Sequence, residues 1–167
     1  MIYFIIGIVA IVVIGVLLVV FKYLKLRDFN KIIETCTYNI NDALDRQEKE
    51  MVIVLEDVKD QKIKESFVNI DSSDMFCKEE LLFNVSWSIN KYFEENDVND
   101  NNKKILRNIN NIEEELEGLK DYYNLNASRY NELYNKIPFV YIFRLLKLNS
   151  KKIFKIRKLE NYEILKD

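Results

Sequence analysis

The 167-residue sequence contains no histidine, only three glycines, one proline and two cysteines. The missing histidine removes the commonest general base and the commonest metal ligand, which argues against an enzyme. Three scattered glycines cannot form a phosphate-binding loop. So few glycines and prolines also disfavour β-sandwiches and barrels, which need many tight turns. The formal net charge of −2 gives no general attraction to nucleic acid, so we expect no such partner.

The two cysteines, Cys36 and Cys77, lie far apart in the chain and form no CxxC motif. On helices they are best explained as small apolar core residues in the reduced form. A disulfide or a reactive thiol is the alternative interpretation. No pattern of residues indicates a catalytic site, a cofactor, a metal ion or a small-molecule substrate, and we expect none.

Residues 1–21 form a hydrophobic run without any charged side chain. As an α-helix the run would be ~31 Å long, enough to cross a hydrocarbon layer of ~30 Å. It has neither the basic start nor the small-residue cleavage site of a signal peptide. We therefore predict a transmembrane helix that stays attached to the protein.

The basic residues Lys22, Lys25, Arg27 and Lys31 follow this run directly. Positive charge next to a membrane span favours the cytoplasmic side. The sequence thus predicts a single-pass protein of the cell membrane, with its N-terminus outside and the rest of the chain in the cytoplasm. A reducing compartment also agrees with unpaired cysteines.

The rest of the chain has the apolar periodicity of long amphipathic helices, over about 22–64, 75–95 and 105–137. Asp74, with Ser72 and Ser73, offers N-cap chemistry before the second helix, and Pro138 is expected to end the third. A short apolar helix, FVYIFRLLK, follows. The positions predicted to face the core are Phe29, Ile33, Cys36, Ile40, Leu44, Met51, Leu55, Val58, Met75, Leu82, Val85, Ile89, Tyr92 or Phe93, Ile105, Ile109, Ile112, Leu116, Leu119, Tyr123, Ala127, Tyr130, Tyr134 and Ile137.

Such helices can bury their apolar stripes only against one another. We predict an all-α fold, with an N-terminal transmembrane helix followed by an antiparallel bundle of three long helices plus a short fourth. The domains would be a transmembrane helix (1–21), a cytoplasmic bundle (22–148) and a basic C-terminal tail (149–167). Because no glycine or proline lies between Gly15 and Gly118, the span and the first bundle helix can be one continuous rod.

A tyrosine-asparagine pair occurs three times in the segment DYYNLNASRYNELYNKIP, residues 121–138. Its tyrosines are spaced by seven and four residues, which predicts that they line the core; they are Tyr123, Tyr130 and Tyr134. Asn124 and Asn131 repeat at the heptad interval of a coiled coil, on the flank where helices meet. We expect them to bond a neighbouring helix and fix its register. A surface for a partner protein is the alternative.

This segment resembles the C-terminal signature of the LemA family, in which the tyrosine-asparagine pair recurs after seven residues and a proline, here Pro138, follows. The likeness extends to other positions, namely Ile40, Leu44, the segment VLEDVK at 54–59, Glu113, Lys120 (usually arginine in the family) and Phe154. The resemblance implies a bacterial, membrane-tethered helical bundle without an agreed biochemical activity. It implies no catalytic residues.

The sequence departs from the family pattern at residues 45–53. There the family has a run of basic residues, an aspartate, an isoleucine and a proline-asparagine pair, and this chain has DRQEKEMVI. A tryptophan expected near Thr37 is also missing. If these residues form a shared surface in the family, this chain has changed it.

Eight basic residues and no acid lie between Lys136 and Lys158. The last five form a candidate interaction cluster in the tail, made of Lys151, Lys152, Lys155, Arg157 and Lys158. We interpret the run as a solvated helix face plus a loose tail; binding to anionic lipid or to an acidic partner is the alternative. Three helices that reverse in turn would put Pro138 far from the membrane, which argues against lipid. The acidic segment IEEELE, residues 112–117, is interpreted as an exposed helix face.

These features predict a non-enzymatic, single-span membrane protein whose bundle is a docking or scaffolding surface for protein partners that the sequence does not identify. One alternative is a transmembrane sensory or signalling bundle. Such a bundle needs a ligand-binding part outside the membrane, where this sequence places only its first residue. A second alternative is an enzyme that uses glutamate and tyrosine in a cleft of the bundle.

Overall fold

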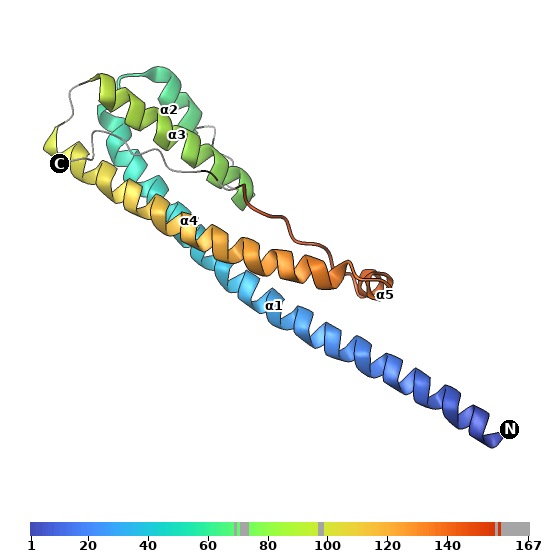
Figure 1. Cartoon of the computed structure of the whole chain (residues 1–167). Coiled ribbons are helices and arrows are strands. Elements are labelled where there is room, and N and C mark those ends of the chain that lie inside the picture. Colours follow the sequence, from blue (N-terminus) through green and yellow to red (C-terminus); the bar gives the residue numbers. More distant parts are fainter. Residues whose placement is uncertain (69, 71–73, 97–98, 156, 158–167) are drawn as a thin grey trace. The chain divides into compact units, whose positions relative to one another are not determined.

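A computed structural model describes the chain except for residues 69, 71–73, 97–98, 156 and 158–167. The described part contains five α-helices and no strand, which confirms the predicted all-α fold (Figure 1). The helices are α1 (Ile2–Asp57), α2 (Gln61–Val68), α3 (Met75–Glu95), α4 (Asp100–Tyr134) and α5 (Phe139–Leu145). The chain forms two compact units: unit 1 comprises Met1–Cys36 and Tyr122–Ile153, and unit 2 comprises Thr37–Asp121 and Phe154–Asp167.

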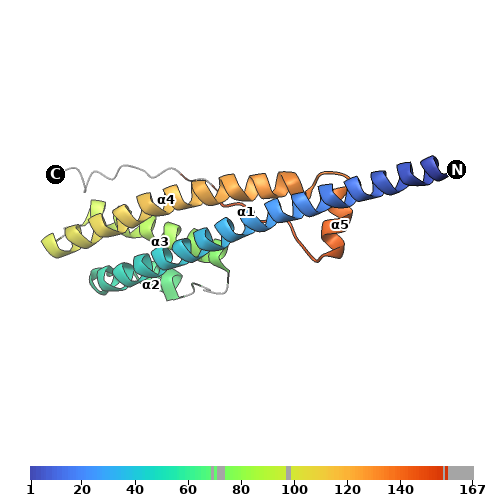
Figure 2. The same ribbon diagram turned by 90° about the horizontal axis from the view of Figure 1, so that it is seen from below.

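The first 21 residues of the chain are almost entirely exposed, and Figure 2 shows this part of α1 extending past the other elements of unit 1 to the N-terminus. The segment is long and apolar enough to cross a membrane, judged by length and composition. Helix α1 continues past it without a break, as the lack of glycine and proline allows.

Helix α1 nevertheless ends at Asp57, earlier than the predicted Lys64, and the short helix α2 follows. The backbone N–H of Lys59 donates to the Tyr92 hydroxyl at 3.2 Å, and that of Lys62 donates to Asp60 Oδ1 at 2.8 Å. Asp60 is thus a side-chain cap that starts α2. Because these donors are satisfied outside α1, the helix stops although no glycine or proline interrupts it.

Side-chain caps also start helices α3 and α4. Asp74 is the N-cap of α3, as predicted, and accepts from the Phe76 N–H at 3.0 Å; Ser72 and Ser73 lie outside the described residues. Asn99 accepts from the Asn102 N–H at 2.7 Å, so α4 begins at Asp100, ahead of the predicted start.

At its other end α4 stops at Tyr134 rather than next to Pro138. A proline lacks the N–H that would bond the carbonyl four residues earlier, and its ring clashes with that carbonyl. For Pro138 that carbonyl belongs to Tyr134, where the helix ends. The prediction that Ile137 belongs to the buried stripe is wrong, since its side chain is exposed.

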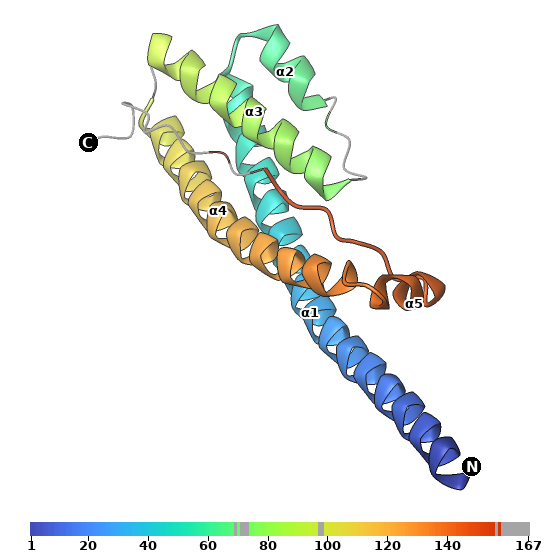
Figure 3. The same ribbon diagram turned by 45° about the vertical axis from the view of Figure 1, so that its right-hand side comes forward.

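Unit 2 has an aliphatic core between α1, α3 and α4. Its large, fully buried side chains include Ile40, Leu44, Met51, Val54, Leu82, Ile89, Leu106 and Ile109. Helices α2 and α3 pack side by side, as Figure 3 shows. Within this unit α1 and α4 are antiparallel, because Gln47 bonds Glu113 whereas Asp57 bonds Asn102. The prediction of a buried Cys77 is wrong: Cys36 is buried but Cys77 is exposed.

Unit 1 has a core of stacked aromatic rings, which confirms the burial predicted for Tyr123, Tyr130 and Tyr134. The Tyr130 and Tyr134 ring centroids lie 6.3 Å apart, and Tyr134 stacks in turn on Phe143 of α5 at 6.4 Å. Burying these rings stabilises the packing of α4 and α5.

The end of α4 lies beside the first charged turn of α1, because Lys136 and Lys22 line the same surface hollow. This overturns the expectation that Pro138 lies far from the membrane side of the bundle. The physical reason is α2, which adds one reversal of the chain that the sequence did not reveal. After α5 the chain turns back along α4 (Figure 3).

Candidate functional site: a buried polar network

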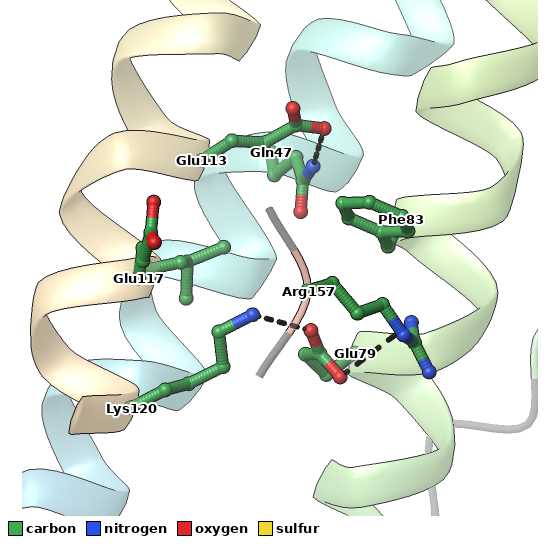
Figure 4. A pocket seen from close by; sticks show the side chains of 8 residues that line it. Gln47, Glu79, Phe83, Glu113, Glu117, Lys120 and Arg157 are labelled. Atoms are coloured by element: carbon green, nitrogen blue, oxygen red, sulfur yellow. Dashed lines mark hydrogen bonds and ion pairs between the residues drawn. The ribbon is translucent and has the colours of Figure 1, made fainter. Parts of the chain in front are cut away.

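A network of polar and ionisable side chains crosses the interior of unit 2 (Figure 4). One of its buried carboxylates is that of Glu113 on α4, which accepts a hydrogen bond from the side-chain amide of Gln47. Glu113 is 6% exposed, and Gln47 Nε2 of α1 donates to Glu113 Oε1 at 2.9 Å. Burial raises the pKa of Glu113 to about 7, against the opposing effects of Gln47 and of the Lys120 charge. Glu113 therefore titrates near neutral pH.

Ser86 of α3 also faces Glu113 and favours its charged form. The Ser86 hydroxyl does not form a hydrogen bond with Glu113, because among the described residues Ser86 Oγ has no partner at bonding distance and angle. Ser86 is therefore a nearby dipole rather than a bonded partner of Glu113.

Two turns further along α4, Lys120 forms the innermost ion pair of the network. Its Nζ lies 2.6 Å from Glu79 Oε1 on α3, and both side chains are less than a tenth exposed. Arg157, in the C-terminal segment, lies 3.9 Å from Glu79 Oε2 and 2.8 Å from Glu80 Oε1. Its guanidinium also covers the Phe83 ring at 5.1 Å. The Glu79 carboxylate thus lies between two cations, with Lys120 near one oxygen and Arg157 near the other (Figure 4).

Further pairs join the outer edges of the same helices. Lys78 of α3 lies 2.7 Å from Asp45 and 2.6 Å from Glu48, both on α1. Burial by itself lowers the pKa of Lys78, but these two carboxylates outweigh it and the pKa is raised. Arg46 bonds Glu115 of α4 at 2.7 Å. Residues 45–48 therefore join α1 to both other long helices of the unit.

The space enclosed by the network measures about 10 Å³ and is lined by residues that include Gln47, Glu113 and Lys120 (Figure 4). That volume suits about one water molecule. It is far too small for an organic substrate or a cofactor. Among the residues that the structure describes, no group of three Cys, Asp or Glu could hold a metal ion.

A larger surface groove of about 370 Å³ lies between α2 and α3 in unit 2. The single tryptophan of the chain, Trp87, lines it with 41% of its surface exposed. The Lys91 ammonium lies 5.3 Å from the centre of the Trp87 ring, and Tyr92 lines the groove beside them. Charged residues of both signs, among them Lys62 and Glu95, complete the lining. We call this feature the Trp87 groove.

The predicted motif residues lie in unit 1 and do not meet the network. Tyr123, Tyr130 and Asn124 are buried there, whereas Pro138 is exposed. Asn131 was expected to bond another helix, but it bonds the chain after α5 instead. Its Nδ2 donates to the Lys151 carbonyl at 2.9 Å, and the Lys151 N–H donates to Asn131 Oδ1 at 2.7 Å.

The described part of the tail is held by helices, which corrects the interpretation of a loose segment. In unit 2 the buried ring of Phe154 stacks on Phe76 at 4.3 Å, and Arg157 pairs with α3. Lys155 lies 3.6 Å from Glu80. In unit 1 the Lys151 ammonium lies over the Tyr130 ring. Lys152 has partners as well, and Lys158 lies outside the described residues.

Sequence reasoning missed most of the network. Glu113 was interpreted as exposed, and Gln47 and Glu79 received no role. One signal was present: Glu113 and Lys120 are seven residues apart, on the face of α4 that also carries Leu116. A polar pair on an apolar face predicts buried partners on the opposite helices.

No protein-family model matches the chain, and no match was found among curated proteins or solved structures. The resemblance to the LemA family stays a prediction from the sequence.

Proposed function

We propose that the chain is a membrane-anchored, non-enzymatic protein whose helical bundle is a docking or scaffolding module at the cytoplasmic face of the cell membrane. The Trp87 groove is the observation that carries the proposal. The apolar part of α1 supports the anchor, and the basic residues after it support the orientation. The resemblance to the LemA family agrees with both.

The groove has the chemistry of a protein-binding surface. Tryptophan and tyrosine are enriched among the residues that dominate binding energy, because they bury a large area with few rotatable bonds. Trp87 is exposed on α3 between residues of both charges, such as Lys91 and Asp60. A partner segment with one large apolar side chain and charges of both signs fits this lining. A nucleic acid would require a uniformly basic one.

The buried network supports a structural rather than a catalytic role for the ionisable residues of unit 2. Lys120 and Glu79 neutralise each other, and the Glu113 carboxylate accepts a hydrogen bond from Gln47. The enclosed volume leaves no room for a substrate next to these groups. We infer that they determine how the helices pack, and that partners bind outside them.

Site-specific photo-crosslinking in intact membranes tests the groove. A photoreactive phenylalanine analogue replaces Trp87 in one variant and Tyr38, an exposed aromatic residue elsewhere in unit 2, in the control. We expect discrete adducts of defined mass from position 87 and none from position 38. Equal labelling at both positions, or none at either, would contradict docking at the groove.

The orientation has its own test. A single cysteine placed at Asp167, in a variant without Cys36 and Cys77, should be protected from an impermeant thiol reagent in intact cells. Lysis should expose it. Labelling before lysis would place the bundle outside and rule out a cytoplasmic docking role.

A transmembrane sensory bundle is the second candidate, favoured by the unbroken helix α1. A sensor would depend on helix rotation, and one inserted residue rotates the following helix by about 100°. We would insert one or seven residues between Phe21 and Lys22 and repeat the crosslinking. A tether keeps its adducts in both variants. A sensor loses them after one residue and recovers them after seven, which is about two full turns.

A further inference from the structure

Helix α5 carries an exposed apolar stripe on the side opposite its packed face. Tyr141 and Leu145 of α5 are 62% and 84% exposed, and Ile137, which precedes the helix, is 78% exposed. Val140 and Phe143 are buried on the other side. Tyr141 and Leu145 are four residues apart and therefore lie one above the other on α5. We call these two residues, together with the exposed Ile137 just before the helix, the apolar stripe.

Both ends of α5 lie where the apolar part of α1 ends. Lys136, just before α5, lines a hollow of about 390 Å³ together with Lys22 and Lys25. Lys136 chiefly lowers the pKa of Glu132, and Lys22 and Lys25 lower it further, so these charges lie within electrostatic reach of one another.

At the other end of α5, residues 147–151 line a second hollow, of about 320 Å³, with Tyr23 and Leu26 of α1. The chain is turned there by Lys147, whose φ of 58° is left-handed. The N–H groups of Lys147 and Leu148 bond the carbonyls of Arg144 and Phe143 at 3.0 Å each, a Schellman arrangement that ends the helix. This closed turn holds α5 next to the first charged turn of α1.

The charge of unit 1 suits an anionic surface. By sequence it holds ten Lys or Arg and three Asp or Glu, although the whole chain has a net charge of −2. Arg144 and Lys147 are exposed next to the stripe, as is Lys136. Exposed apolar side chains that include a Tyr, with basic residues beside them, are typical of segments that lie in the headgroup region of a bilayer.

We propose that α5 is a second, peripheral membrane contact, in which Ile137, Tyr141 and Leu145 insert at the boundary between headgroups and acyl chains of an anionic bilayer. Lys136, Arg144 and Lys147 then contact lipid phosphates. The contact lies beside the membrane span of the same unit, so the bilayer is present at high local concentration. It reverses the conclusion from the sequence that this region lies too far away to meet lipid.

The test uses the full-length chain in vesicles and a single tryptophan as a depth probe. Trp87→Phe removes the native tryptophan, and Tyr141→Trp places the probe on the stripe. The matched control is Tyr122→Trp, a similarly exposed tyrosine of unit 1. It lies on α4 ahead of Lys136 by fourteen residues, or about 20 Å along the helix.

We expect lipids brominated near the headgroup to quench the tryptophan at 141 at least about twofold more than the one at 122. Quenching should increase when about a third of the phosphatidylcholine is replaced by phosphatidylglycerol. Lys136→Gln with Arg144→Gln should abolish that increase. The control pair, Lys49→Gln with Lys104→Gln, removes the same amount of charge from exposed positions of unit 2. In this control the increase in quenching with phosphatidylglycerol should remain.

Three results would overturn the proposal. Equal quenching at 141 and 122 would show that α5 does not enter the lipid. Quenching at 141 that is the same in neutral and anionic vesicles would exclude the basic contacts. A blue-shifted emission at 141 in detergent that depends on protein concentration would show that a second copy of the chain covers the stripe. Circular dichroism would confirm that each variant remains helical.

Discussion

Units 1 and 2 are built from the same kind of helices but place their charges differently. Unit 1 holds ten basic and three acidic residues by sequence, whereas unit 2 holds fifteen and twenty-four. The modest net charge of the chain therefore conceals two units of opposite charge. Unit 1, which contains the apolar span, is basic, and unit 2 is acidic. Charge averaged over a whole sequence says little about the surfaces that partners or lipids meet.

The interiors differ as well. The core of unit 1 is aromatic, with Tyr130, Tyr134 and Phe143 in a stack. Unit 2 instead admits an ion pair between Lys120 and Glu79. Apolar burial tolerates small shifts of one helix along another, but a buried ion pair does not, because a shift would leave a charge without a partner. We infer that the network determines helix register in unit 2, and that ring packing does so in unit 1.

Breaking the ion pair should have the largest effect. Lys120→Met leaves the Glu79 carboxylate buried, with Arg157 3.9 Å away as its nearest cation. We expect the free energy of unfolding to fall by ~3 to 5 kcal/mol, measured by denaturant unfolding in detergent. The double variant with Glu79→Leu should recover most of the loss, because it removes the orphaned charge. A loss below ~1 kcal/mol in the single variant would show that the pair does not organise unit 2.

The corresponding change in unit 1 is Tyr123→Ala, with its neighbour Tyr122 as the matched control. Tyr123 is 4% exposed and Tyr122 is 52% exposed. Removing the buried ring should cost ~3 kcal/mol or more, since it leaves a cavity. Tyr122→Ala should change stability by less than ~0.5 kcal/mol. Similar losses in both variants would contradict the distinction between the packed and the open face of α4.

The pH dependence of stability should belong to unit 2. The pKa of Glu113 is raised from 4.5 to about 7, so between these values the folded protein binds more protons than the unfolded chain. Stability due to Glu113 should then fall as pH rises from about 4.5 to about 7, by at most ~3 kcal/mol.

Glu113→Gln should remove this slope while keeping an acceptor for Gln47, and the exposed neighbour Glu114→Gln should retain it. The difference between the two variants across the pH range isolates Glu113 from the other acids. An identical slope in both would show that the carboxylate of Glu113 is not desolvated.

The smallest effect concerns the chain after α5. Asn131→Ala removes both hydrogen bonds to the backbone of Lys151 and should cost ~1 to 3 kcal/mol. Asn135→Ala, at an exposed position one turn later, should be neutral within ~0.5 kcal/mol. A neutral Asn131→Ala would restore the alternative that Asn131 faces a partner protein.

The sequence by itself determined the fold class, the apolar span and most of the core. These follow from local information, because a 3.6-residue periodicity and a run of apolar residues depend only on neighbours in the chain. The core predictions concern such periodic positions, and those at Ile40, Leu82, Ile109 and Tyr130, for example, are confirmed by their burial. The N-cap at Asp74 was predictable for the same reason.

Only the tertiary structure decided where the polar residues lie. Glu113 and Glu114 are adjacent and identical, yet Glu113 is buried and Glu114 is exposed, because Gln47 lies opposite the first. The early end of α1 was equally hidden, since it depends on the Tyr92 hydroxyl of another helix. That ending adds α2 and one reversal of the chain, and so brings Lys136 beside Lys22. Contacts between residues distant in sequence set these positions, and the pattern of one sequence does not encode them locally.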